Sequence, residues 1–186
     1  MHGIISDRRV KAFATVVAYF SLREFVGYNP IINDEIRDIL LQQSNLARQV
    51  YFQTGKIENT NILYPESPDQ LPLPGPDAQD VSDYYYDRVE DCWPNFSRKM
   101  APMSYEAHIK SHVLDYAKDL VIPYLGITGS EAFSKPYTER FMNEILHDKK
   151  TMKIIEGARH VQMYDKKEYI NEAIEDLTIF FLRELS

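Results

Sequence analysis

The sequence predicts an α/β domain with a small parallel sheet, and two observations support that prediction. Three short apolar segments with β-branched residues lie at 10–18, 121–128 and 150–156. Patterns typical of amphipathic helices follow the last two segments, at 134–148 and 165–185, so strand and helix alternate along the second half of the chain. Strands joined through helices require right-handed crossovers, and such crossovers place the strands parallel in one sheet.

The first half of the chain begins with one strand and then loses the alternation. Residues 10–18 read VKAFATVVA, an apolar run typical of a strand buried on both faces. Residues 33–53 carry apolar side chains at mostly helical spacing and predict a long helix. Residues 61–80 contain five prolines, two of which flank a glycine, so we expect an extended loop there.

The middle of the chain has the character of an insert. Residues 80–120 combine many aromatic side chains with prolines at positions 94 and 102, which break the segment into short helices. We therefore expect residues 21–115 to form a helical and loop insert. Residues 1–20 and 116–186 then form the core that contains the sheet.

The last helix, residues 165–185, has an apolar stripe that we expect to pack on the sheet. Asp165 is followed three residues later by Glu168, which is the spacing of a capping box at a helix start. The stripe consists of Tyr169, Ile170, Ala173, Ile174, Leu177, Phe180, Phe181 and Leu185.

Composition excludes several classes of function. The 186 residues are 44% hydrophobic and 26% charged, as in an ordinary globular domain, and the net charge of -7 gives no support for binding nucleic acid or anionic lipid. The N-terminus lacks the order of a signal peptide, and no apolar run is long enough to span a membrane. The single cysteine, Cys92, fits a reducing compartment, so we expect a cytoplasmic protein without cofactor or metal.

Four stretches resemble a known family when they are taken in order. They are SDRRVKAFATV at the front, a proline- and tyrosine-rich insert, VIPYLGITGSEA, and GARHVQMYD before the last helix. Together they resemble the C-terminal half of an α/β-hydrolase, and more closely the dienelactone-hydrolase-like branch, which has a helical insert after the sixth strand. The resemblance implies that residues 10–18, 121–128 and 150–156 are the sixth, seventh and eighth strands.

The resemblance also implies that the catalytic nucleophile is missing. In the family the first five strands, the oxyanion-hole loop and the nucleophile elbow precede the sixth strand. The elbow has the pattern G-x-S-x-G or its cysteine version, and neither occurs in these 186 residues.

Two site residues follow from the resemblance. His160 corresponds to the triad histidine, which takes the proton of the nucleophile and passes it to the leaving group. The alternative is a loop histidine without a catalytic role. Glu131 is the candidate acid, although many relatives carry the acid further along the loop, where this chain has Ala132 and Phe133. The alternative for Glu131 is a solvated loop charge.

Other polar and aromatic residues are better explained by structure. His108 and His112 have the i, i+4 spacing of a zinc pair on one helix face, but no H-E-x-x-H motif surrounds them, so a solvated face is favoured. Cys92 has no elbow and is expected to be a small buried hydrophobe. The insert aromatics are expected to pack, with a substrate pocket as the alternative, and three serines lack the elbow of a nucleophile. These residues are Tyr84, Tyr85, Tyr86, Trp93, Phe96, Ser104, Ser130 and Ser134.

The function expected from the resemblance is hydrolysis of a small-molecule ester, thioester or amide through an acyl intermediate on serine or cysteine. The chain by itself would be inactive. The alternative is a non-catalytic interaction or regulatory protein that reuses the half-fold. Because the strand at 10–18 would lack one neighbour, its partner is expected to be the missing N-terminal half or a second copy of the chain, paired through this edge.

Overall fold

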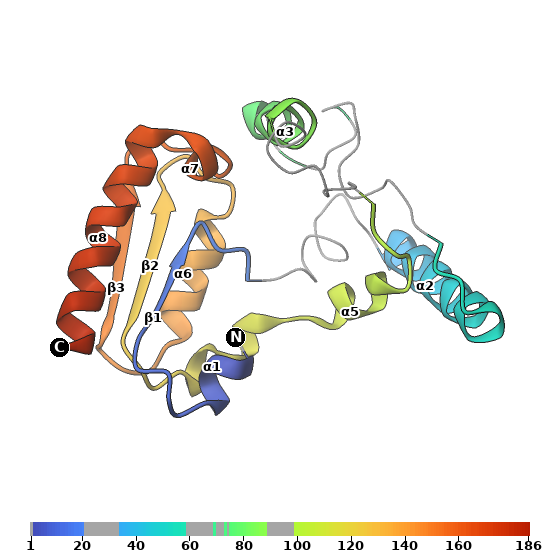
Figure 1. Ribbon diagram of the computed structural model, residues 1–186, viewed down its shortest axis with the longest axis horizontal. Helices are drawn as coiled ribbons and strands as arrows, with labels where there is room; N and C mark the ends of the chain where they lie inside the picture. Colours follow the sequence, from blue (N-terminus) through green and yellow to red (C-terminus); the bar gives the residue numbers. More distant parts are fainter. Residues whose placement is uncertain (1, 21–33, 59–68, 70–72, 74, 89–98) are drawn as a thin grey trace. The chain divides into compact units, whose positions relative to one another are not determined.

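The computed structural model describes residues 2–20, 34–58, 69, 73, 75–88 and 99–186. The chain divides into two compact units, the first formed by Met1–Phe20 with Val113–Ser186 and the second by Ser21–His112. The sheet lies in the first unit (Figure 1).

The sheet has three parallel strands in the order β1-β2-β3. β1 spans Phe13–Val16, β2 spans Tyr124–Gly129 and β3 spans Lys150–Ile155. Tyr124 pairs with Phe13 on one side and with Lys150 on the other, so the three strands start level with one another. The predicted α/β class and the parallel arrangement are confirmed.

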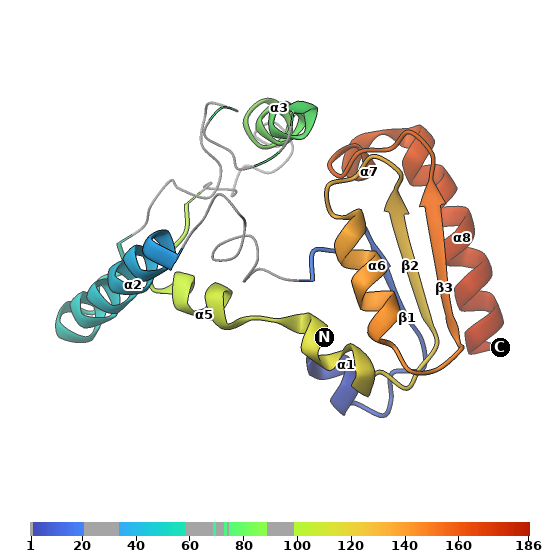
Figure 2. The same ribbon diagram turned by 180° about the vertical axis from the view of Figure 1, so that it is seen from behind.

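Helices cover the sheet from both sides, as Figure 1 and the reverse view in Figure 2 show. α8 (Lys167–Leu185) packs on one face and α6 (Lys135–Glu144) on the other. Successive side chains of a strand point to opposite faces, and β2 is buried at every position, so it contributes to both cores. The core on the α8 side includes Leu125, Ile127, Ile155, Ala173 and Phe180, and the core on the α6 side includes Phe20, Leu120, Tyr124, Phe141 and Ile145.

The first strand is shorter than the predicted segment at 10–18, because β1 begins at Phe13 and ends at Val16. The next residue, Val17, has a φ of 42°, a left-handed conformation that interrupts a strand and is unusual for a β-branched residue. Its N–H still donates to the carbonyl of Ile127 at 2.8 Å, so the hydrogen bonding to β2 extends one residue past the strand.

The start of the last helix also differs from the prediction. α7 (Gln162–Asp165) is a separate helical turn, and Lys166 has an extended backbone before α8 begins. The capping box predicted from Asp165 and Glu168 is wrong, because Asp165 belongs to α7. Lys166 occupies the N-cap of α8 and makes no side-chain capping bond.

The second unit contains the long helix that the sequence predicts. α2 (Asp34–Thr54) confirms the helix expected at 33–53. α5 (Ser104–Lys110) packs on it through a small apolar cluster that consists of Leu40, Leu41, Met100, Tyr105 and Ile109.

The proline-rich segment ends in a helix that the sequence analysis misses. α3 (Gly75–Asp83) occupies part of the expected loop at 61–80. Pro76 lies in its first turn, where the absent N–H costs no intrahelical bond, and Asp77 adds a negative charge near the helix N-terminus. The expectation of a loop is therefore wrong for residues 75–80.

Three short elements complete the described residues. They are α1 (His2–Ser6), the π-helical turn η3 (Tyr84–Arg88) and the 3-10 helix η4 (Val113–Asp119). Within the described residues, no helix has the length and apolar character needed to cross a membrane.

Candidate active site

The loops that follow β2 and β3 are bound to each other, and together they carry the candidate site. The N–H of Glu131 donates to the carbonyl of Ala158 at 3.1 Å, and the N–H of Ser130 donates to the carbonyl of Ile155 at 2.9 Å. Ser130 Oγ also accepts from the N–H of Gly157 at 2.8 Å. Gly157 has a φ of 73°, which lets the chain turn sharply after β3.

This turn places His160 at the carboxyl ends of the parallel strands, in the loop where the sequence predicts it. The side chain is buried, with 7% of the residue exposed. Its Nδ1 lies 2.6 Å from Ser134 Oγ, and its Nε2 lies 2.5 Å from the hydroxyl of Tyr164. The ring of Phe133 stacks on the imidazole with the centroids 4.3 Å apart. The imidazole is therefore held on both nitrogens and on one face.

Burial lowers the pKa of His160 from its ordinary value to about 4. The cationic form loses its hydration inside the protein, and no charged side chain offsets that loss. The imidazole is consequently neutral at physiological pH.

Glu131 does not bind His160 in this structure. Its side chain is exposed, and among the described residues the hydrogen-bond partners of the imidazole are Ser134 and Tyr164. Ser134 is fully buried at the start of α6, three residues beyond Glu131. A hydroxyl therefore stands at Nδ1, the ring nitrogen that a triad acid contacts.

The sequence analysis missed Ser134 and Tyr164 as partners of His160. The available signal for Ser134 was its place in the same loop as the candidate acid, three residues after Glu131. Tyr164 lies four residues after His160, within α7. That spacing brings two side chains to the same side of a helical turn.

Aromatic side chains from α6 and from the segments that follow β1 and β2 extend the site. The ring of Tyr19 lies 6.1 Å from that of Phe133 and 4.3 Å from that of Tyr137, and the two tyrosine hydroxyls are 2.9 Å apart. A partly apolar surface with phenolic hydroxyls therefore lies beside the imidazole.

Comparisons with known proteins find similar solved structures but no matching sequence family. No family model matches the chain, and no curated protein matches it. The hypothetical protein PA2218 from Pseudomonas aeruginosa is 24% identical with a TM-score of 0.75, over 97% of this chain and 56% of that protein. DcsB, solved in complex with its substrate analogue, is 20% identical with a TM-score of 0.71, over 97% of this chain and 59% of DcsB. A monoacylglycerol lipase from Paleococcus ferrophilus is 15% identical with a TM-score of 0.57, over 98% of this chain and 63% of the lipase.

The chain has part of the α/β-hydrolase fold. At these identities the likeness concerns the fold alone. The chain spans 56% to 63% of the length of the three proteins, so the activity of a whole α/β-hydrolase does not transfer to it directly.

Two other histidines that the sequence analysis considers, His108 and His112, do not form a pair on one helix. α5 ends at Lys110 and the backbone of Ser111 is extended, so His108 and His112 do not share a helix face. Within the described residues no cluster of three or more histidine, cysteine or acidic side chains forms a metal site.

The aromatic residues of the insert are only partly described. The rings of Tyr84 and Tyr85 pack edge to face with centroids 4.9 Å apart, and the Arg88 guanidinium lies over Tyr84. These contacts are consistent with packing within the second unit. Cys92, Trp93 and Phe96 lie outside the described residues.

Proposed function

We propose that this chain carries the histidine-bearing part of an α/β-hydrolase site that cleaves an ester, a thioester or an amide by acyl transfer. The place of His160 carries the proposal, because it follows β3 at the carboxyl ends of parallel strands, where open α/β sheets bind their ligands. In this proposal His160 is the triad histidine, and the attacking serine or cysteine belongs to a polypeptide segment outside these 186 residues. Glu131 stays the predicted acid, although a rearrangement of its loop would be needed to bring the carboxylate to the imidazole.

The position of the second unit supports the finer assignment to the dienelactone-hydrolase-like branch. Residues 21–112 are inserted between β1 and β2, which correspond to the sixth and seventh strands of that resemblance. In the proposal, the aromatic surface beside His160 holds the acyl part of a small-molecule substrate. The single cysteine continues to favour a cytoplasmic protein.

The chain by itself is expected to show no ester turnover above background. Without a nucleophile elbow and oxyanion donors, His160 has no attacking atom to activate and nothing stabilises the tetrahedral intermediate. We would incubate the purified chain with p-nitrophenyl acetate and butyrate and with a fluorophosphonate probe. Stoichiometric labelling of one serine would contradict the prediction, because it would reveal a nucleophile within these residues.

The proposed function is tested with the reading frame extended upstream of Met1. If that frame encodes an elbow, the longer protein should hydrolyse p-nitrophenyl esters, and His160→Ala should lower kcat/KM by about a thousandfold or more. His108→Ala, which changes a histidine of the other unit, should leave the rate unchanged. An active longer protein that tolerates His160→Ala, or a frame without any elbow, would overturn the proposal.

The second candidate is a non-catalytic interaction or regulatory protein. It is favoured by one observation, namely that both nitrogens of His160 are bound to hydroxyls of the same chain and none to a carboxylate. A frame that begins at Met1 behind its own promoter, with no upstream elbow, would support this candidate.

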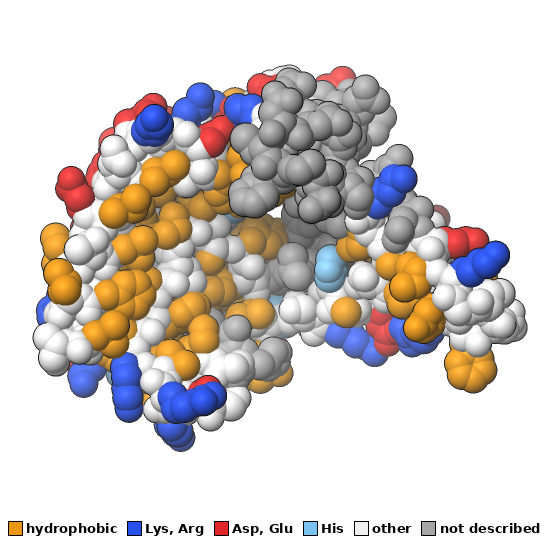
Figure 3. Space-filling view, viewed as in Figure 1, with side chains coloured by type: hydrophobic (Ala, Val, Ile, Leu, Met, Phe, Trp, Pro, Cys, Tyr) orange, Lys and Arg blue, Asp and Glu red, His pale blue; other side chains and the backbone are white. Residues whose placement is uncertain are grey.

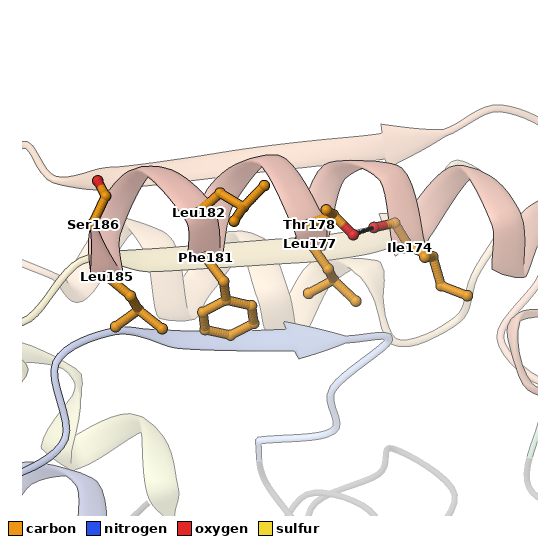
Figure 4. A pocket seen from close by; sticks show the side chains of 7 residues that line it. All are labelled: Ile174, Leu177, Thr178, Phe181, Leu182, Leu185 and Ser186. Carbon is orange, nitrogen blue, oxygen red and sulfur yellow. Dashed lines mark hydrogen bonds between the residues drawn. The ribbon is translucent and has the colours of Figure 1, made fainter.

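We also propose that the free edge of β1 is an association surface, with a second copy as the occupant when the chain is alone. Among the described strands β1 pairs with β2 only, so within the described part of the chain no strand covers its other edge. An apolar groove of about 540 Å³ runs along α8 beside this edge. Figure 4 shows Leu177, Phe181 and Leu185 pointing from α8 toward β1, and Figure 3 shows hydrophobic side chains gathered on this face of the first unit.

The chain alone is therefore expected to associate or aggregate at micromolar concentration, as measured by light scattering after size exclusion. Leu185→Glu places a charge in the groove at a residue that is 59% exposed and should reduce the association. Ile179→Glu is the matched control on α8, since Ile179 is 64% exposed and does not line the groove. A stable monomer at high concentration, or equal effects of the two variants, would contradict this assignment.

A further inference from the structure

The hydroxyls of Ser134 and Tyr164, which bind the two ring nitrogens of His160, do not by themselves decide which nitrogen of the neutral imidazole carries the hydrogen. A neutral imidazole has one N–H donor and one acceptor nitrogen, whereas a hydroxyl can donate or accept. The distances of 2.6 Å from Nδ1 to Ser134 Oγ and of 2.5 Å from Nε2 to the Tyr164 hydroxyl suit either tautomer. The surroundings of the two hydroxyls decide between them.

Ser134 lies where no water reaches it, since none of the residue is exposed. Within the described part of the chain, the only hydrogen-bond partner of its hydroxyl is His160 Nδ1. If Nδ1 carried the hydrogen, it would donate to Ser134 Oγ and leave the buried serine hydrogen without an acceptor. If Nδ1 is unprotonated, the serine donates to it and the hydroxyl is satisfied.

Tyr164 is in a different position, because 40% of the residue is exposed. Its phenolic oxygen can accept from Nε2–H, and its own hydrogen can then turn toward solvent or toward another partner of the partly exposed side chain. The tautomer with the hydrogen on Nε2 therefore satisfies both hydroxyls. The other tautomer leaves one buried donor unpaired, a penalty that corresponds to about a tenfold to hundredfold change in the ratio of tautomers.

We propose that Ser134 is a positioning residue that holds His160 in the Nε2–H tautomer, so that the imidazole presents a hydrogen-bond donor at Nε2 instead of a base. A carboxylate beside Nδ1, in place of the Ser134 hydroxyl, would favour the other tautomer. It can only accept, so it would keep the hydrogen on Nδ1 and leave the Nε2 lone pair ready for a proton. The inference concerns the protonation of the imidazole and does not depend on whether the site hydrolyses esters.

The tautomer has a consequence for any reaction at this site. An Nε2–H group on a neutral imidazole can donate to a carbonyl or phenolic oxygen, as Tyr164 illustrates. Proton acceptance at Nε2 requires the minor tautomer first. A Ser134 hydroxyl thus reduces the fraction of the protein that is ready for general-base catalysis by about tenfold or more.

The experiment is nitrogen-15 NMR of the labelled chain at neutral pH, with long-range correlations from the ring carbon-bound hydrogens. The His160 signals are assigned by their absence from His160→Gln. We expect an unprotonated, pyridine-like Nδ1 and a protonated, pyrrole-like Nε2. A wild-type spectrum with the hydrogen on Nδ1, or with both tautomers equally populated, would overturn the proposal even if neither Ser134 variant folds.

Two substitutions at Ser134 separate positioning from packing. Ser134→Ala removes the serine donor, so the preference for the Nε2–H tautomer should weaken and the population of the Nδ1–H tautomer should rise. Ser134→Asp should place the hydrogen on Nδ1 and raise the pKa of His160, because a carboxylate stabilises the cation. Ser186→Ala is the control, since that serine bonds the carbonyl of Arg183 at the end of α8 and should leave the tautomer unchanged. Unchanged ring-nitrogen signals in a folded Ser134→Ala would also count against the proposal.

Discussion

Gly129→Ala is expected to destabilise the first unit by about 3 kcal/mol, the upper end of the usual cost of overpacking, because the added methyl group meets main-chain atoms. A Cβ built on Gly129 would lie 2.0 Å from the carbonyl oxygen of Ala158 and 2.6 Å from its carbonyl carbon. Those atoms belong to the main chain, and the same carbonyl accepts the N–H of Glu131. Neither loop can move aside without breaking the bonds between them.

The same substitution should loosen the candidate site, since Ala158 lies two residues before His160. Urea unfolding followed by circular dichroism gives the change in stability, and the imidazole NMR signals report the site. Gly3→Ala is the control, because Gly3 lies in α1 with no heavy atom within 4 Å of the added Cβ. A Gly129→Ala protein within about 1 kcal/mol of wild type would show that the two loops are not locked together.

The sheet could be predicted from local sequence because its strands carry the signal themselves. β2 and β3 lie within the apolar segments predicted at 121–128 and 150–156, except for Gly129 at the end of β2. The end of β1 could not be predicted, since Val17 adopts a left-handed backbone that its β-branched side chain disfavours locally. That conformation is set by the surrounding structure and not by the residue itself.

The site could be predicted only in part, for a similar reason. The place of His160 depends on a strand, a glycine turn and a helix that are adjacent in sequence, so local patterns suffice. Its partner at Nδ1 comes from another loop, 26 residues away, and depends on how the loops after β2 and β3 dock. Glu131 was the natural choice by chemistry, whereas the backbone bond of its N–H to Ala158 ties down the main chain and leaves the carboxylate in solvent.

The first unit is also expected to lose stability in mild acid because of His160. Its pKa is about 4 in the folded protein and about 6.5 when the chain is unfolded. Between these two pKa values the imidazole is protonated in the unfolded chain and neutral in the folded chain, so lowering the pH favours unfolding. The contribution of the neutral His160 imidazole to the free energy of unfolding is present in full above pH 6.5, decreases as the pH falls toward 4, and is lost below pH 4. The difference of about 2.5 units corresponds to roughly 3 kcal/mol of unfolding free energy.

The groups around His160 make this loss specific to the imidazole. Phe133, Ser134 and Tyr164 contact the ring, and none of them carries a charge between pH 4 and 7. Urea unfolding at pH 7 and pH 4.5, followed through the amide signals of β2, should show a smaller loss in His160→Gln than in the wild type. His108→Gln removes a histidine of the second unit and should keep the full loss. If His160→Gln and the wild type lost the same stability in acid, the imidazole would titrate near its ordinary pKa. The protein in solution would then not contain the buried imidazole with a hydrogen bond on each nitrogen.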